Sequence, residues 1–318
     1  MTRKLALIGC AVTCIAAAAP AQATFPGRNG RIAYADYMSG QIYTINPDGS
    51  ARRKLTHVKK GSADSPAWSP GGASVAFVVY PPNGPPQIWT ARADGTHASR
   101  VLHDAPGFGD RSPSFSPSGK QIVFTRCHPE PKDACAIWRM GVDGSHKRAL
   151  TPFVDGPKDV HGDFDPSVSP NGKRIAFTRF QAGGFASRVF VMGANGSHPK
   201  AITAPSLEGF QPDWAPSGGR ITFSSAAVRT GSSVFTVKPN GKGVHRLTPG
   251  RFPHNDALST YSPRGDRIAF VSDRSYPDTC CNDLFTMKPS GARERRVHTH
   301  PKGAGIITPA WGSAPLVR

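Results

Sequence analysis

Short apolar runs separated by Pro, Gly, Ser and Asp recur along the chain, and no segment beyond residue 24 shows clear helical periodicity. Residues 65–72 read Ser-Pro-Ala-Trp-Ser-Pro-Gly-Gly, and the apolar triplet Val75-Ala76-Phe77 follows them. An aromatic residue, a Ser-Pro-x-Gly turn and an apolar triplet predict a strand, a tight turn and a second strand. The same pattern returns around these residues: Phe115, Val168, Trp214 and Tyr261.

Trp68 and its equivalents are 47, 53, 46 and 47 residues apart. Each copy continues with a third apolar strand, a tight turn and a fourth strand. The third strands contain these pairs: Ile88-Trp89, Ile137-Trp138, Val189-Phe190, Val234-Phe235 and Leu284-Phe285. The turns that follow are these: Asp94-Gly95, Asp143-Gly144, Asn195-Gly196, Asn240-Gly241 and Ser290-Gly291. Four antiparallel strands per repeat, with this period, predict the blades of a β-propeller.

The two ends of the chain complete one more blade. Residues 30–56 match the second, third and fourth strands of the repeat, but no Trp-Ser-Pro strand precedes them. The missing first strand lies at the other end, where residues 308–312 read Thr-Pro-Ala-Trp-Gly. Five whole repeats and one shared repeat predict an all-β, six-bladed propeller that the N- and C-terminal strands close together. Deleting the chain from Thr308 onward should therefore destabilise the whole ring.

The pattern Pro-x-Trp-Ser-Pro-x-Gly-x-x-Ile-Ala-Phe resembles the TolB-like propeller repeat, a PD40 or WD40-like repeat of bacterial envelope and secreted proteins. The resemblance covers residues 28–313 and implies the same fold. Function stays open, because such propellers serve as binding proteins, as gating domains of serine peptidases and as lyases. TolB carries a separate α/β domain before its propeller. We expect this chain to lack that domain, since Ala23 and Gly30 leave no room for it.

The N-terminus has the layout of a secretory signal. Two basic residues precede an apolar run and a small-residue cleavage site that ends at Ala23. We expect residues 1–23 to be removed, residues 24–318 to form the propeller, and the product to be secreted or periplasmic. Acylation at Cys10 in the manner of a lipoprotein is the alternative, although the apolar stretch before Cys10 is short.

The chain is strongly basic. It contains 39 Lys and Arg against 21 Asp and Glu, a formal net charge of +18 that falls to +16 when the leader removes Arg3 and Lys4. Such a surface favours anionic partners, and salt weakens the attraction. We expect a monomer without a membrane span that binds an envelope protein, a peptide or an anionic glycan and no specific nucleic acid. A solvated basic rim without specificity would account for the same charge.

Four cysteines follow the leader. Cys127 and Cys135 flank a short loop between two predicted strands, where a disulfide would form in an oxidising compartment. Cys280 and Cys281 are adjacent in the matching loop of a later repeat. They could form a vicinal disulfide, stay as thiols or pair elsewhere.

The loops that enter the first strands are the predicted ligand-binding region, because the first strand of a blade lies nearest the central channel. These loops supply the following polar residues: Asp64, Asp110, Arg111, Asp163, Asp165, Glu208, Gln211, Asn255 and Asp256. Several carboxylates at one channel mouth could bind a cation or a basic peptide. Asp and Asn before a strand also bond their own backbone and cap turns, which is the alternative role.

His161, Asp163 and His254 are weak metal candidates in the same loops. Residues 159–165 alternate acids with His but lack the full calcium-loop pattern, so we expect no cofactor, with a divalent cation such as calcium as the alternative. The sequence contains no Gly-x-Ser-x-Gly elbow and no Walker or Rossmann glycine pattern. Serine-hydrolase and nucleotide-binding functions therefore have no support.

The leading hypothesis is a secreted or periplasmic, non-enzymatic propeller that binds a protein, peptide or glycan in the bacterial cell envelope. The alternative is a metal-assisted polysaccharide lyase or another glycan-cleaving enzyme with its active site in the channel. A third hypothesis is a polyanion-binding protein that acts through its basic rim.

Overall fold

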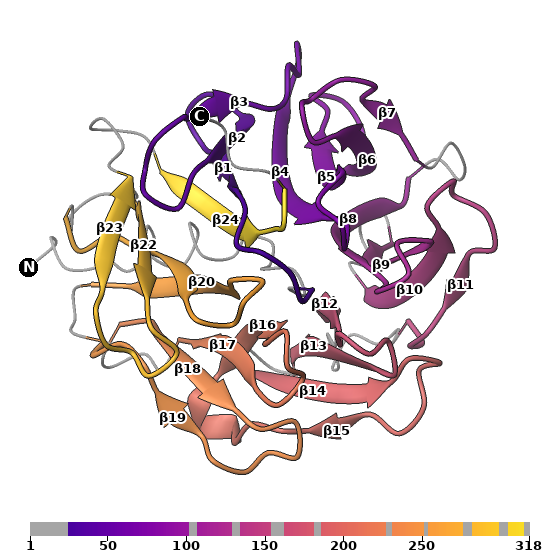
Figure 1. Cartoon of the computed structure of the whole chain (residues 1–318). Coiled ribbons are helices and arrows are strands. Elements are labelled where there is room, and N and C mark those ends of the chain that lie inside the picture. The colour runs from indigo at the N-terminus through magenta and orange to yellow at the C-terminus, as the bar shows by residue number, and fades with distance from the viewer. Residues whose placement is uncertain are drawn as a thin grey trace, which may run out of the picture.

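The fold is a ring of six four-stranded antiparallel sheets, which are numbered as blades 1 to 6 (Figure 1). The structure is a computed structural model that describes residues 25–101, 107–128, 134–153, 162–180, 186–226, 231–250, 254–275, 282–298 and 305–314. The expectation of an all-β, six-bladed propeller is confirmed. Within these residues the one helix is a single 3-10 turn, η1 (Pro205–Leu207), and no helix is long and apolar enough to cross a membrane.

Each blade contains four strands, ordered from the innermost to the outermost. Blades 1 to 3 contain β24 (Ile306–Trp311), β1 (Ile32–Asp36), β2 (Gln41–Ile45), β3 (Arg53–Lys54); β4 (Ser62–Trp68), β5 (Ser74–Tyr80), β6 (Gln87–Arg92), β7 (Ser99–Arg100); and β8 (Gly109–Phe115), β9 (Gln121–Cys127), β10 (Cys135–Gly141), β11 (Arg148–Ala149). Blades 4 to 6 contain β12 (Asp163–Val168), β13 (Arg174–Phe180), β14 (Ser187–Gly193), β15 (Lys200–Ala201); β16 (Gly209–Trp214), β17 (Ile221–Ser225), β18 (Ser233–Val237), β19 (His245–Arg246); and β20 (Asp256–Tyr261), β21 (Ile268–Ser272), β22 (Asp283–Met287), β23 (Arg295–His298).

Blade 1 is the shared blade. The C-terminal strand β24 pairs antiparallel with β1, and Trp311 lies opposite Ile32 in the register. The indole Nε1 of Trp311 donates to the carbonyl of Gly30 at 3.0 Å. The prediction that both chain ends complete one blade is confirmed, and the ring therefore has no unpaired inner strand.

The core lies between neighbouring blades. Each second strand buries one aromatic ring to 1% exposure or less, and the six rings are these: Tyr34, Phe77, Phe124, Phe177, Phe223 and Phe270. The clusters around them cross the blade boundaries, since Ala67 of blade 2 and Phe115 of blade 3 pack in the same cluster. Burial of an aromatic ring contributes about 2 to 3 kcal/mol, so the repeated aromatic position stabilises every interface of the ring.

Glycines in the turns between third and fourth strands pack against the backbone of the neighbouring blade. Gly49 has a φ of 91°, and a Cβ there would lie 2.4 Å from the carbonyl oxygen of Val297 in blade 6. Gly291 has the same relation to Leu247 in blade 5, also at 2.4 Å. Only glycine suits both the positive φ and the close backbone approach. The Asp-Gly and related turns are therefore contacts between blades.

The ring has two faces. The face at which the inner strands begin and the second strands end is called the mouth face. The face that carries the Ser-Pro-x-Gly turns between first and second strands is called the turn face. The candidate residues from the sequence belong to the mouth face, because they stand at the beginnings of β4, β8, β12, β16 and β20.

Candidate functional site

Every inner strand contains a β-bulge near the mouth face. Each inner strand breaks register with its second strand, and one residue in each bulge has φ between 49° and 58°. The six residues are these: Ser65, Ser112, Asp165, Gln211, Leu258 and Thr308. A bulge re-aims side chains and is common beside binding sites. Backbone strain at six equivalent positions, five of them polar, marks this ring as the candidate site.

Hydroxyl groups of the preceding blade hold three of these bulges in place. Thr178 Oγ1 accepts the backbone N–H of Gln211 at 2.9 Å. The equivalent bonds run from Asp165 N to Thr125 Oγ1 at 3.2 Å and from Leu258 N to Ser224 Oγ at 3.0 Å. Each acceptor follows the buried aromatic residue of a second strand. Hydroxyl groups of the neighbouring blade thus satisfy the backbone N–H groups of these bulges.

Three of the predicted carboxylates are paired with arginine inside their own blades. Asp110 accepts from Arg126 Nε at 2.7 Å and Nη2 at 2.9 Å, and both side chains are under 10% exposed. Asp163 binds Arg179 in the same two-point manner at 2.6 and 2.8 Å. Asp256 accepts from Arg274 Nη2 at 2.7 Å. All three carboxylates are buried, and the Asp110 and Asp163 pairs are bidentate. Charge-assisted pairs of this kind satisfy the carboxylates, so these residues hold the blade together.

An aromatic ring of the third strand lies close to the guanidinium group of each of these arginines. The guanidinium carbon of Arg126 lies 5.1 Å from the centre of the Trp138 ring, and Arg179 lies 4.9 Å from the Phe190 ring. Arg274 lies 4.8 Å from the equivalent Phe285. Each arginine is therefore held between an inner-strand carboxylate and a third-strand aromatic ring, which adds a cation–π contribution.

Asp165 lies in the bulge of blade 4 without an arginine of its own. It accepts a hydrogen bond from Ser112 Oγ at 3.2 Å and a long one from Thr178 Oγ1 at 3.4 Å. Burial raises the pKa of Asp165 to about 7, although these hydrogen bonds and the charge of Arg111 oppose the shift. The carboxyl group of Asp165 is therefore ready to change its protonation near neutral pH.

Asp64 lies beside the bulge of blade 2 and contacts blade 1. Its carboxylate accepts from the hydroxyl of Thr308 and from the backbone N–H of Ser65. Burial raises the pKa of Asp64 to about 6, against the effect of these two bonds. Asp64 thus joins the C-terminal strand to the ring and is a second carboxyl group with a raised pKa at this face.

Tyr80 interacts electrostatically with both carboxyl groups and with Arg111. Burial and the charges of Asp64 and Asp165 raise the pKa of Tyr80, whereas Arg111 lowers it. The guanidinium carbon of Arg111 is 5.9 Å from the Tyr80 ring centre. Within the described residues, its buried Nε has no hydrogen-bond partner. We call Asp64, Tyr80, Arg111 and Asp165 the inner cluster. The Arg111 side chain as a whole is partly exposed, and the exposed N–H groups of a guanidinium can bind an incoming acceptor.

The other predicted residues are held in local structure. Gln211 is 1% exposed in the bulge of blade 5, and Glu208 ends η1 with a φ of 43°. Asn255 donates to Asp273 through its backbone N at 2.6 Å and its side-chain Nδ2 at 2.7 Å. This last arrangement agrees with the alternative of turn capping.

The metal candidates are not assembled within the part of the chain that the structure describes. Asp163 is bound by Arg179, and the buried Nδ1 of His254 has no hydrogen-bond partner within the described residues. His161 lies outside the described residues. No group of three or more His, Cys, Asp or Glu that could hold a metal occurs among the residues described. The expectation of no cofactor, with a divalent cation such as calcium as the alternative, stays a prediction.

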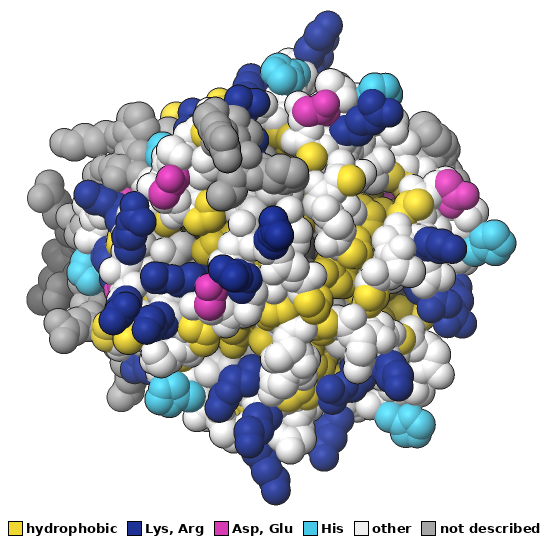
Figure 2. Space-filling model, viewed as in Figure 1, with side chains coloured by type: hydrophobic (Ala, Val, Ile, Leu, Met, Phe, Trp, Pro, Cys, Tyr) yellow, Lys and Arg dark blue, Asp and Glu magenta, His cyan; other side chains and the backbone are white. Residues whose placement is uncertain are grey.

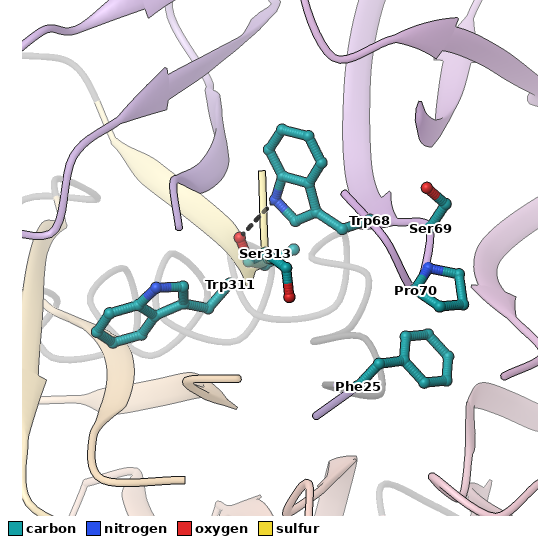
Figure 3. A pocket seen from close by; sticks show the side chains of 8 residues that line it. Phe25, Trp68, Ser69, Pro70, Trp311 and Ser313 are labelled. Atoms are coloured by element: carbon teal, nitrogen blue, oxygen red, sulfur yellow. Dashed lines mark hydrogen bonds between the residues drawn. The ribbon is translucent and has the colours of Figure 1, made fainter. Parts of the chain in front are cut away.

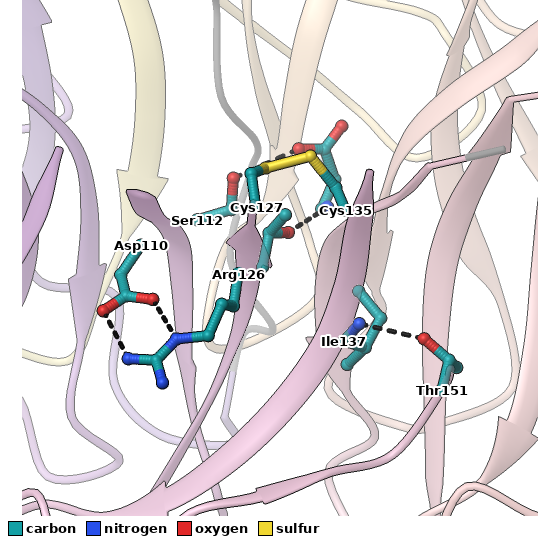
Figure 4. Close-up of a disulfide and its surroundings, with 9 residues drawn as sticks. Asp110, Ser112, Arg126, Cys127, Cys135, Ile137 and Thr151 are labelled. Carbon is teal, nitrogen blue, oxygen red and sulfur yellow. Dashed lines mark hydrogen bonds and ion pairs between the residues drawn. A yellow bond between two sulfur atoms is a disulfide. The ribbon is translucent and has the colours of Figure 1, made fainter. Parts of the chain in front are cut away.

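A disulfide joins Cys127 and Cys135 at the mouth face (Figure 4). The two residues are direct register partners on β9 and β10, with Cα atoms 4.0 Å apart. Cys127 follows Arg126 in the chain, so the bridge fixes the end of β9 that carries the Asp110 pair. Cys280 and Cys281 lie outside the described residues.

A small pocket lined mainly by apolar side chains lies at the turn face (Figure 3). Phe25, 7% exposed, lines this pocket together with Trp68 and Trp311. The segment that follows it crosses to blade 6, where Gly27 N donates to Pro263 O at 3.2 Å. The indole of Trp68 donates to the carbonyl of Ala310 at 3.2 Å. This pocket is small and its lining includes no charged side chain, whereas the mouth face gathers several carboxyl and guanidinium groups.

The sequence reasoning missed the partners of the predicted acids, namely Arg126, Arg179, Arg274, Tyr80 and Thr308. A signal was present for two of them. The sequence Phe-Thr-Arg occurs twice, at 124–126 and at 177–179. Its Phe enters the core, its Thr holds the next bulge and its Arg binds the inner-strand Asp. Tyr80 and Thr308 have no such signal. Thr308 meets Asp64 across the closure of the ring, and Tyr80 contacts Arg111 of the next blade.

Comparison with known proteins gives TolB among the relatives and among the similar solved structures, beside an uncharacterised peptidase of Bacillus subtilis that is 29% identical over 189 residues, 59% of this chain and 25% of that protein. No family model matches the chain. The Tol-Pal system protein TolB of Francisella tularensis subsp. mediasiatica is 24% identical over 287 residues, which are 87% of this chain and 61% of that protein. The crystal structure of TolB from Acinetobacter baumannii aligns with a TM-score of 0.71 at 20% identity, over 92% of this chain and 68% of that one. The chain has the fold of the TolB β-propeller and is similar to TolB in sequence over most of its length.

A further relative matches a shorter part of the chain. An uncharacterised protein of Agrobacterium fabrum is 31% identical to this chain over 145 residues, 44% of this chain and 47% of that protein. The chain thus spans about half to three-fifths of these two curated relatives. At 20% identity, the likeness to the solved TolB structure establishes the fold alone.

Proposed function

We propose that this TolB-like propeller is a non-enzymatic binding protein of the bacterial cell envelope, exported by its N-terminal leader, and that it holds a protein, peptide or glycan at the mouth face. The inner cluster is the observation that carries the proposal. It combines an arginine whose Nε has no partner within the described residues with two carboxyl groups whose pKa values are raised. The relation to a Tol-Pal system protein supports the envelope setting.

The chemistry of the inner cluster suits recognition of a polar group. The guanidinium of Arg111 donates to a carboxylate or carbonyl of the partner. Asp165 and Asp64 accept from an amine, amide or hydroxyl, and a cation placed beside them lowers their pKa values again. The carboxylates of Asp110, Asp163 and Asp256 are paired with arginines of their own blades. A ligand is therefore bound by the inner cluster, with the paired acids as its rigid frame.

The proposal is tested with Arg111→Gln and Asp165→Asn, which keep the shape of both side chains. Lys120→Gln is the control, because Lys120 is exposed on the turn face of the same blade. Wild type and variants are immobilised and exposed to cell-envelope extract at low and high salt, and the eluted partners are identified. We expect Arg111→Gln and Asp165→Asn to lose a partner that wild type and Lys120→Gln retain at high salt. Equal retention by all four proteins would refute the proposal.

A further inference from the structure

The turn face carries a basic cluster on blade 5 that lacks counter-charge. In blades 1 to 3 the turn between third and fourth strands contains Asp48, Asp94 or Asp143, whereas blades 4 and 5 have Asn195 and Asn240. The Asn side chains still cap the turn, since Asn240 Oδ1 accepts the N–H of Lys242 at 3.0 Å. The substitution keeps the turn and removes its negative charge.

Three cations gather around Gly243 at this tip. Arg220 Nη1 donates to the carbonyl of Gly243 at 3.1 Å, and Lys238 N donates to the carbonyl of Lys242 at 3.0 Å. A Cβ on Gly243 would lie 3.8 Å from Lys238 Cε and 4.0 Å from Arg220 Nη2. Lys238 and Lys242 are exposed. The backbone of the tip thus holds Arg220, while the two lysines reach solvent.

A fourth cation comes from blade 4. Gly241 packs on the chain end of β15, where its Cβ would lie 3.3 Å from the carbonyl oxygen of Ile202. Lys200, exposed, is part of that strand. We call Lys200, Arg220, Lys238 and Lys242 the basic patch. In the space-filling view the area over β18 and β19 shows Lys and Arg without Asp or Glu (Figure 2).

No acid neutralises the basic patch within the described part of the chain. None of its four residues takes part in an ion pair there. The acids of blade 5 are Glu208, which precedes β16 at the mouth face, and Asp213, which is fully buried. Exposed like charges held together repel each other, and a bound anion relieves that repulsion.

Blade 6 shows the same arrangement with compensation. Arg267 Nη1 donates to the carbonyl of Arg293 at 3.4 Å, and Lys288 N donates to Ala292 O at 2.8 Å. In this blade, however, Asp266 precedes Arg267, and Glu294 follows Arg293 and pairs with Arg274. The absence of both acids from blade 5 is therefore not required by the fold.

We propose that the basic patch is a second binding surface, independent of the mouth face, for a polymer that carries closely spaced oxyanions such as phosphates. Arg220 presents a guanidinium fork that is already oriented by Gly243, and the three lysines supply mobile point charges. Four cations within two adjacent blades match successive charges of an extended chain better than a single small anion. Binding releases counterions and weakens steeply with salt.

The test uses inorganic polyphosphate as the probe and two charge-matched double variants. Lys238→Gln with Lys242→Gln removes two charges from the basic patch, and Lys288→Gln with Arg293→Gln removes two from the equivalent turn of blade 6. We expect the blade 5 variant to bind polyphosphate about tenfold more weakly and the blade 6 variant less than about threefold. The slope of log K against log salt should fall by about 1 to 2 in the blade 5 variant alone.

Equal losses in the two double variants, or no binding by wild type at low salt, would overturn the inference. Circular dichroism checks that each variant keeps the fold. Arg111→Gln, on the opposite face, should bind polyphosphate as wild type does. A loss in Arg111→Gln would place the polymer at the mouth face and contradict a separate surface.

Discussion

The two faces of the ring handle charge in opposite ways. At the mouth face, buried carboxylates pair with arginines that are buried, as in the Asp110 pair of blade 3, or half-buried, as in the Asp163 pair of blade 4. On the turn face of blade 5, Lys238 and Lys242 are exposed and without acid partners within the described residues. Buried charge fixes local geometry at a cost in desolvation, whereas exposed charge contributes little to stability and acts on partners at a distance. The comparison assigns rigidity to one face and electrostatic attraction to the other.

The largest effect expected from this comparison is the loss of a buried pair. Arg126→Ala leaves the Asp110 carboxylate buried without its partner and should lower the free energy of unfolding by about 4 kcal/mol. Lys120→Gln, an exposed change in the same blade, should alter it by less than about 0.5 kcal/mol. Denaturant unfolding monitored by fluorescence measures both. A cost below about 1 kcal/mol for Arg126→Ala would show that the mouth-face pairs are not structural.

The second expected effect is an increase in the free energy of unfolding. Burial raises the pKa of Asp165 to about 7, above the value near 4 of an unfolded Asp. The stability that comes with a protonated Asp165 is present below about pH 4 and is lost as pH rises through 7. Asp165→Asn should therefore stabilise the protein at pH 8, on the order of 3 kcal/mol, and this gain should vanish by pH 4.

The control for this prediction is Asp110→Asn, made at a carboxylate that its arginine stabilises. It should lower the free energy of unfolding at pH 8. Unfolding of the wild type and both variants is followed over the same pH series. A stabilisation by Asp165→Asn that does not change with pH would mean that the Asp165 carboxyl group keeps an ordinary pKa.

The smallest effect is the difference between two glycine substitutions on the turn face, one packed against a neighbouring blade and one in open space. Gly49→Ala combines a positive φ with a Cβ 2.4 Å from the Val297 oxygen and should cost about 3 kcal/mol. Gly218→Ala has a φ of 69° but meets nothing within 4 Å, so about 1 kcal/mol is expected. The melting temperatures of the two variants measure the difference. Equal shifts in melting temperature would mean that the Asp-Gly turn does not pack tightly against the neighbouring blade.

The fold was predictable from the sequence because the same three signals recur in each repeat. The aromatic residue of the first strand, the Ser-Pro-x-Gly turn and the Asp-Gly turn fix strand order, and Trp311 without a second strand after it indicated the shared blade. The positions of the polar residues at the mouth face were also predictable, since they stand directly before β4, β8, β12, β16 and β20 or at their beginnings.

The roles of those residues were not predictable to the same degree. Whether Asp163 is paired and Asp165 is not depends on Arg179, which lies opposite Asp163 in the register. The raised pKa of Asp165 depends on burial between blades and on Ser112 of the preceding blade. Contacts between strands of different blades follow from the closed ring, and single-repeat patterns do not contain them. The bulges, too, appear only once strand pairing is known.

The measurement that tests the central claim most directly is hydrogen–deuterium exchange of the wild-type protein with and without its captured envelope partner. A mouth-face site predicts slower exchange in peptides covering the beginnings of β4, β8 and β12, and no change in the Ser-Pro-x-Gly turns. Slower exchange confined to the turns of the opposite face, with β8 and β12 unaffected, would contradict the assignment of ligand binding to the mouth face.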